Sequence, residues 1–140
     1  MKLSNEWFAV AYNTDGGEVV LRGRMHLDVV REQFPMLIEM QWKIKGDEKG
    51  MPTDVESDVI DNVMHIVCEA VERSEKGVLT AVHTGAGRVR YLFYATSVDD
   101  FMQQIEALLQ RLQALPLTIA AKPDASWQEY TEMIARCAMQ

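Results

Sequence analysis

The side chains of this sequence that could do chemistry gather on one stretch with helical periodicity. Asp58, Asp61, His65 and Glu69 follow one another at intervals of three or four residues. On a helix they would lie near one line, where neighbouring members could share a cation. A transition-metal site usually needs at least two histidines or cysteines in a sheltered place, whereas this line would be an exposed ridge. We therefore expect no metal and no cofactor, and we expect His65 to contact Asp61.

A glycine-containing run, Thr84-Gly85-Ala86-Gly87-Arg88, superficially suggests a phosphate-binding loop. Phosphate loops gain their strength by opening a helix, whereas this run joins two strand-like segments, which favours a tight hairpin turn. His83 beside it has no serine or cysteine motif to activate and no carboxylate nearby in sequence to orient it. We predict no catalytic residue, and we favour a protein without a reaction of its own.

The run Arg88–Tyr94 holds three aromatic residues and two arginines, as base-stacking strands of RNA-recognition domains do. However, alternate residues of the run would equally serve a hydrophobic core: Val89, Tyr91 and Phe93. The formal net charge of −7 also repels a phosphate backbone. We therefore expect core packing and no nucleic-acid partner, with the other face of this strand marked as polar by Arg88, Arg90 and Tyr94.

The helix that carries the ridge is predicted from local chemistry. Thr53 and Glu56 form a capping box, Pro52 keeps the helix from starting earlier, and Gly77 stops it. Apolar residues at helical spacing predict one buried stripe: Val55, Val59, Ile60, Val63, Ile66, Val67, Ala70 and Val71. The opposite side is acidic: Asp54, Asp58, Asp61, Asn62, His65, Glu69, Glu72 and Glu75.

Strand patterns flank this helix on both sides. Trp7–Tyr12 and Glu18–Met25 lie around an Asp-Gly-Gly turn and predict a β-hairpin. Leu37–Lys45 alternates apolar and polar residues, which is typical of a strand with one buried face. Beyond the helix, Val78–Thr84 and Arg88–Tyr94 predict a second hairpin.

The remainder alternates helix, strand and helix. Ser97 caps a second helix that Pro116 ends, Leu117–Ala121 is a short strand, and Ser126 caps a last helix from Trp127 to Ile134. The inner face of the second helix is predicted to hold Phe101, Ile105, Leu108, Leu109 and Leu112. The order predicts an α+β fold, a ferredoxin-like βαββαβ sandwich with an extra N-terminal β-hairpin and a C-terminal helix. The hairpin should either extend the sheet or cover its open face.

We expect a single domain over residues 1–140, comprising the hairpin extension (1–34), the ferredoxin-like core (35–122) and the C-terminal helix (123–140). Cys68 and Cys137 lack metal-type spacing and are expected to be reduced thiols. The first residues show no secretory signal, and no apolar run approaches the ~18 residues of a membrane span. These features predict a cytoplasmic protein without membrane contact.

Several of these segments together resemble the bacterial domain-of-unknown-function family 695. The resemblance covers residues 37–134 and rests on caps, turns and core positions: Trp42, Gly50-Met51-Pro52-Thr53 with Glu56, the strand ending at Thr84, the glycine turn, and Arg90-Tyr91-Leu92-Phe93-Tyr94. The tail Asp124-Ala125-Ser126-Trp127-Gln128-Glu129-Tyr130 is also similar to the ending of the ribonuclease E activity regulator B family. That second resemblance implies a ferredoxin-like fold in a small acidic protein that binds a ribonuclease and restrains it.

Two classes of function follow. The first is a non-catalytic binding or regulatory module, in which the acidic face contacts a basic protein region: Asp54, Asp58, Asp61, His65 and Glu69. The second is a small-ligand binder or enzyme with a pocket where the N-terminal hairpin meets the sheet: Trp7, Tyr12, Trp42 and Arg90. A homodimer formed through the open sheet face is a further alternative.

Overall fold

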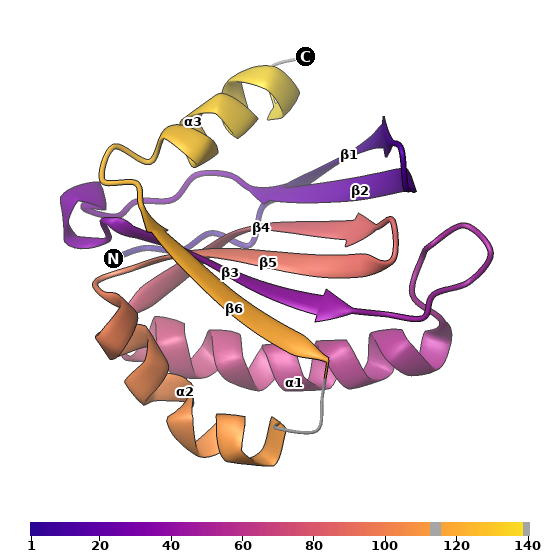
Figure 1. Cartoon of the computed structure of the whole chain (residues 1–140). Coiled ribbons are helices and arrows are strands. Elements are labelled where there is room, and N and C mark those ends of the chain that lie inside the picture. Colours follow the sequence, from indigo (N-terminus) through magenta and orange to yellow (C-terminus); the bar gives the residue numbers. More distant parts are fainter. Residues whose placement is uncertain (113–115, 139–140) are drawn as a thin grey trace.

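The computed structural model describes residues 1–112 and 116–138, and it has an α+β architecture built on one antiparallel sheet (Figure 1). The strands are β1 (Trp7–Thr14), β2 (Gly17–Arg24), β3 (Met36–Lys43), β4 (Gly77–Gly85), β5 (Arg88–Ala95) and β6 (Leu117–Pro123). The helices are α1 (Asp54–Arg73), α2 (Val98–Leu112) and α3 (Gln128–Met133), with short turns η1 (Arg31–Gln33) and η2 (Ile134–Ala138). Figure 1 shows α1 and α2 on one side of the sheet and α3 on the other.

The N-terminal hairpin extends the sheet. The strand order is β1-β2-β4-β5-β3-β6, and each neighbouring pair is antiparallel. Strand β2 pairs with β4 from Val19 opposite Gly85 to Gly23 opposite Ala81. The sheet is therefore two strands wider than the four strands β4-β5-β3-β6 alone.

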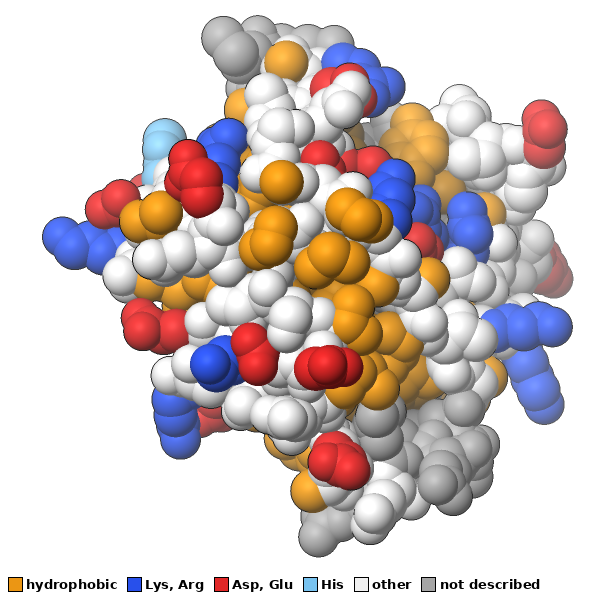
Figure 2. Space-filling view, turned by 60° about the vertical axis from the view of Figure 1, so that its left-hand side comes forward, with side chains coloured by type: hydrophobic (Ala, Val, Ile, Leu, Met, Phe, Trp, Pro, Cys, Tyr) orange, Lys and Arg blue, Asp and Glu red, His pale blue; other side chains and the backbone are white. Residues whose placement is uncertain are grey.

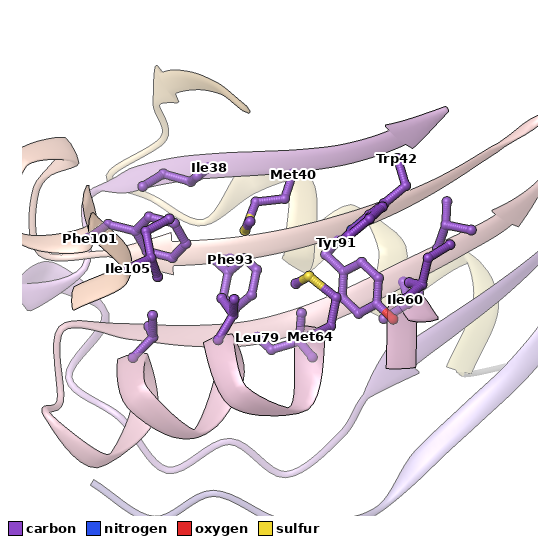
Figure 3. Close-up of a cluster of buried hydrophobic side chains, with 14 of the residues drawn as sticks. Ile38, Met40, Trp42, Ile60, Met64, Leu79, Tyr91, Phe93, Phe101 and Ile105 are labelled. Carbon is purple, nitrogen blue, oxygen red and sulfur yellow. The ribbon is translucent and has the colours of Figure 1, made fainter. Parts of the chain in front are cut away.

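The larger hydrophobic core lies between the sheet and helices α1 and α2 (Figure 3). Alternate residues of β3 and β5 supply its sheet side, as their period-two pattern predicts: Ile38, Met40, Trp42, Val89, Tyr91 and Phe93. Phe101 and Ile105 of α2 are fully buried against them, and the ring of Phe101 meets that of Phe93 edge-on at 5.1 Å. The predicted inner-face residues Leu109 and Leu112 have side chains outside the described part of the structure.

Helix α1 begins as its sequence predicts but buries a narrower face. Thr53 Oγ1 accepts from the Glu56 amide, and the Glu56 carboxylate accepts from the Thr53 amide, which completes the capping box. The buried residues are Ile60, Met64, Val67 and Val71. The broad predicted stripe was wrong at its outer margin, because Val55, Val59 and Ile66 are exposed. It also omitted Met64.

A second core on the opposite face of the sheet holds α3 in place. Trp127 is fully buried, stacks on the Tyr94 ring at 4.3 Å between centroids, and donates from Nε1 to the Phe34 carbonyl. Tyr94 was predicted to mark a polar face, and that prediction was wrong because this core covers it. The Tyr94 hydroxyl instead donates to Asp124 at 2.6 Å.

Asp124, and not Ser126, caps the last helix. Its two carboxylate oxygens accept from the amides of Gln128 and Glu129 at 2.9 and 3.1 Å. Trp127 directly precedes the helix in a left-handed conformation with φ of 56°. Burial alone would raise the pKa of Asp124, but the hydrogen bonds from Tyr94 and from the helix amides outweigh it and hold that pKa below its usual range.

Arg24 at the end of β2 joins the hairpin to the rest of the chain. Its Nη1 donates to Glu72 of α1 at 2.8 Å and to the Leu79 carbonyl of β4 at 3.2 Å, while its Nε donates to the Ser4 carbonyl at 2.8 Å. Only 8% of the Arg24 side chain and 18% of the Glu72 side chain are exposed. Glu72 was predicted to belong to the exposed acidic face, so that prediction was wrong.

The molecular surface mixes apolar and charged side chains. On the face shown in Figure 2, hydrophobic side chains form a band through the middle, and charged side chains of both signs lie around it. Scattered apolar surface is normal in folded proteins and does not by itself mark a site. No helix in the described ranges has both the length and the apolar character needed to cross a membrane.

We predict that Glu72→Ala will destabilise the fold by about 3 kcal/mol, because it leaves the buried Arg24 guanidinium without a counter-charge. Chemical denaturation with urea measures this change. Asp58→Ala removes an exposed carboxylate from the same helix and should leave the free energy of unfolding within about 0.5 kcal/mol of wild type. Equal effects of the two substitutions would show that the Arg24 pair contributes nothing.

Candidate functional site

The five predicted partner-binding residues all lie on the outward side of α1. Asp54, Asp58, Asp61, His65 and Glu69 are exposed. His65 does not pair with Asp61 as predicted. Its Nε2 instead lies 3.6 Å from the Glu69 carboxylate, which also pairs with Arg73. Two members of the acidic face are thus already in contact with each other.

Three apolar side chains lie beside this acidic face. Val55 is 73% exposed, Val59 42% and Ile66 50%. Their spacing of four and seven residues places them on one side of the helix. Their neighbours on α1 include Asp58 and Asn62, so the outer surface of α1 combines an apolar line with carboxylates. We call this combination the α1 surface.

The four predicted pocket residues are divided between the two faces of the sheet. Trp42 is 2% exposed and belongs to the core under α1 and α2. Trp7 packs against the margin of that same core, with the guanidinium groups of Arg22 and Arg24 at 5.3 and 5.4 Å from its ring. Tyr12 and Arg90 lie on the opposite face, where they line one cavity.

A trough occupies the part of that opposite face that α3 leaves uncovered. Its larger section is a cavity of about 640 Å³ between the sheet and the last turns of the chain. The floor is apolar and comes from four strands: Leu21, Leu37, Ala81 and Leu92. Tyr130, Met133 and Cys137 line the wall. A second section of about 460 Å³ shares Tyr12 and His83 with the first.

Polar side chains converge where the two sections of the trough meet. The Tyr12 hydroxyl lies 2.9 Å from His83 Nδ1. Arg90 is directly opposite His83 in the β4–β5 register, and its Nε donates to Glu39 at 2.6 Å. Arg88, two residues earlier on β5, donates to Gln41 at 3.2 Å. Four strands therefore bring hydroxyl, imidazole, carboxylate, amide and guanidinium groups to one row.

The electrostatic setting keeps His83 uncharged near neutral pH. Burial lowers the pKa of His83 to about 4, and the positive charge of Arg90 adds to that effect. A neutral imidazole has one donor and one acceptor nitrogen, so with Nδ1 engaged by Tyr12 its Nε2 can serve a bound molecule. Tyr12 and His83 therefore offer a hydroxyl and an imidazole to a molecule bound in the trough.

Sequence reasoning found the members of this row that come from β3 and β5. The alternation of β5 places Arg88 and Arg90 on one face, and the same alternation in β3 would place Glu39 and Gln41 there. What the pattern did not reveal is the pairing of β2 with β4, which brings Tyr12 beside His83. Within the described residues, no three His, Cys, Asp or Glu side chains lie where they could hold a metal ion. Both cysteines are free.

Comparison with known proteins places the chain in a family. The profile described as "Family of unknown function (DUF695)" matches residues 5–134. The chain belongs to this family. The match includes the N-terminal hairpin, which the resemblance noted from the sequence did not cover. No curated protein matches the chain.

The low pKa of His83 predicts an acid-dependent loss of stability. Between pH 6.5 and about 4 the unfolded chain binds a proton at this residue and the folded protein does not. The contribution of neutral His83 to the free energy of unfolding is therefore fully present above pH 6.5 and is lost as the pH falls toward 4. We expect His83→Gln to show a smaller fall in Tm than wild type between about pH 7 and 4.5.

The matched control is His65→Gln, because His65 is exposed on α1. It should follow the wild-type pH profile. NMR titration of the His83 imidazole tests the same point directly. A midpoint near 6.5 for His83 would contradict a desolvated environment in the trough.

Proposed function

We propose that this DUF695 protein is a cytoplasmic, non-catalytic binding module whose α1 surface docks a basic, amphipathic segment of another protein. The observation that carries the proposal is the exposure of Val55, Val59 and Ile66 on a helix whose remaining apolar residues are buried or partly buried. An apolar line bordered by charge is typical of protein-interaction surfaces. The packing of α1 against the sheet uses its inner face and does not require these three exposed side chains.

The energetics favour a partner that covers the apolar line. Burying a Val or Ile side chain gains roughly 1.5–3 kcal/mol when the burial is complete. Three such residues supply enough driving force for a moderate-affinity complex, even after the entropic cost of association. The acidic residues beside them then select the partner by charge, because like charges are repelled and basic groups are attracted.

The proposed partner segment therefore carries apolar residues on one side and Lys or Arg on the margin. Asp58 and Asp61 are the carboxylates best suited to it, because neither forms an ion pair within residues 1–112 and 116–138, whereas Glu69 is engaged by His65 and Arg73. Binding by exposed charges should weaken as salt is added. A regulatory role would follow if the segment belongs to an enzyme, as in the ribonuclease regulators that the tail resembles.

The finer description of the fold belongs to the same proposal. We infer a ferredoxin-like unit in strands β3 to β6 with α1 and α2. The strand order β4-β5-β3-β6, with both helices on one side of the sheet, supports this inference.

A binding measurement with two double variants tests the α1 surface. The probe is a fluorescently labelled amphipathic helical peptide of leucine and lysine, and anisotropy reports its affinity. Asp58→Lys with Asp61→Lys should weaken binding about tenfold or more and remove most of the salt dependence. Val59→Ser with Ile66→Ser should weaken binding at every salt concentration, because it removes apolar contact.

The control peptide keeps the leucines and replaces each lysine by glutamate. Weaker binding of this peptide is expected, since it meets the carboxylates of α1 with like charge. Capture experiments from native extract with the same variants then identify the natural partner. Absence of peptide binding, or binding that ignores both double variants, would remove the α1 surface as a docking site.

A further inference from the structure

The trough on the α3 side of the sheet is a second candidate site, separate from the α1 surface. Its larger section has the volume of a small-molecule pocket, for which about 300–1,000 Å³ is usual. Leu21, Ala81 and Leu92 give this section an apolar floor, and Met133 closes its side. An apolar body of modest size fits such a lining, since it would replace water against hydrocarbon.

The second section of the trough differs from the first, whose lining also includes Glu129, Glu132 and Arg136. Its charged lining residues are Arg88, Arg90 and Asp15, so cations outnumber anions. Arg90 is offset by its pair with Glu39, whereas Arg88 hydrogen-bonds only the neutral Gln41 and forms no ion pair within the described ranges. Arg88 is therefore the cation of this section that can pair with an anionic ligand.

The side chains at the boundary between the two sections can hydrogen-bond a ligand without carrying a charge. Tyr12 and His83 line both sections and are hydrogen-bonded to each other. Since His83 is directly opposite Arg90, a group bound at the arginines would lie beside the imidazole. A ligand that spans the boundary would thus meet hydrocarbon on one side and donors on the other.

We propose that the trough binds an amphipathic carboxylate, with its apolar body on the Leu21 and Leu92 floor and its carboxylate at Arg88 and Arg90. Guanidinium groups are suited to carboxylates because their donors match the two oxygens. Tyr12 and His83 position the head group at the junction. This site does not depend on the α1 surface, which lies on the other face of the sheet.

Isothermal titration calorimetry with decanoate tests the proposal. Decanamide is the matched probe, because it keeps the chain length and lacks the charge. Wild-type protein should bind decanoate saturably and at least about tenfold more tightly than decanamide, which is the size of one charge-assisted hydrogen bond. Equal affinities, or no saturable binding of decanoate, would overturn the carboxylate site.

Three variants locate the binding. Arg88→Gln should weaken decanoate about tenfold and leave decanamide unchanged, because Arg88 is exposed and removing its charge alters only the head-group end. Cys137→Trp fills the apolar section and should weaken both probes. Asp58→Lys with Asp61→Lys on the α1 surface should change neither affinity.

Thermal unfolding confirms that each variant is folded before titration. If Arg88→Gln leaves the affinity for decanoate unchanged, the ligand binds elsewhere and the assignment is wrong. An unchanged affinity in Cys137→Trp would overturn the assignment in the same way. Failure of these experiments leaves the peptide test of the α1 surface unaffected, because the two tests use different variants and different probes.

Discussion

The buried ion pair of Arg24 with Glu72 is the constraint on which the rest of the architecture depends. The charge of an arginine whose side chain is only 8% exposed must be compensated, and here Glu72 and two backbone carbonyls supply the acceptors. The carbonyl of Arg24 in turn accepts from the Tyr130 hydroxyl at 2.5 Å. One residue thereby joins the N-terminal segment, β2, α1, β4 and the α3 layer. Both helical layers are anchored to the end of the same strand.

This anchoring explains why the hairpin widens the sheet and does not fold over it. With the end of β2 held to α1 and β4, the edge of β2 that does not pair with β1 lies along β4 and pairs with it. The wider sheet then presents more surface than α3 can cover. The second core around Trp127 fills one end of that surface, and the trough lies beside it. The trough is thus a consequence of a six-stranded sheet with a short final helix.

Local rules predicted the elements well, and tertiary contacts account for the rest. The capping box at Thr53 and the alternation in β3 depend only on neighbouring residues, and both are confirmed. Periodicity places an apolar residue on a helix face but does not give the width of the face that is buried, so Val55 was misplaced. Nothing local indicates that Glu72 will meet Arg24, 48 positions away. Asp124 caps the last helix in place of Ser126 because the Tyr94 hydroxyl holds its carboxylate, and this contact joins distant segments of the chain.

The alternation of side chains across the sheet also keeps the two candidate surfaces apart. In β5, Tyr91 and Phe93 pack under α1 and α2, while Arg90 and Leu92, which alternate with them, face the trough. Each strand therefore contributes side chains to both faces of the sheet, but each side chain lies on only one face. A substitution on the α1 surface can reach the trough only by shifting a strand that its neighbours hold in a continuous ladder. Such distant sites usually act additively. The α1 surface and the trough are for that reason separable in a single chain, and a protein with both could engage a partner and a ligand at once.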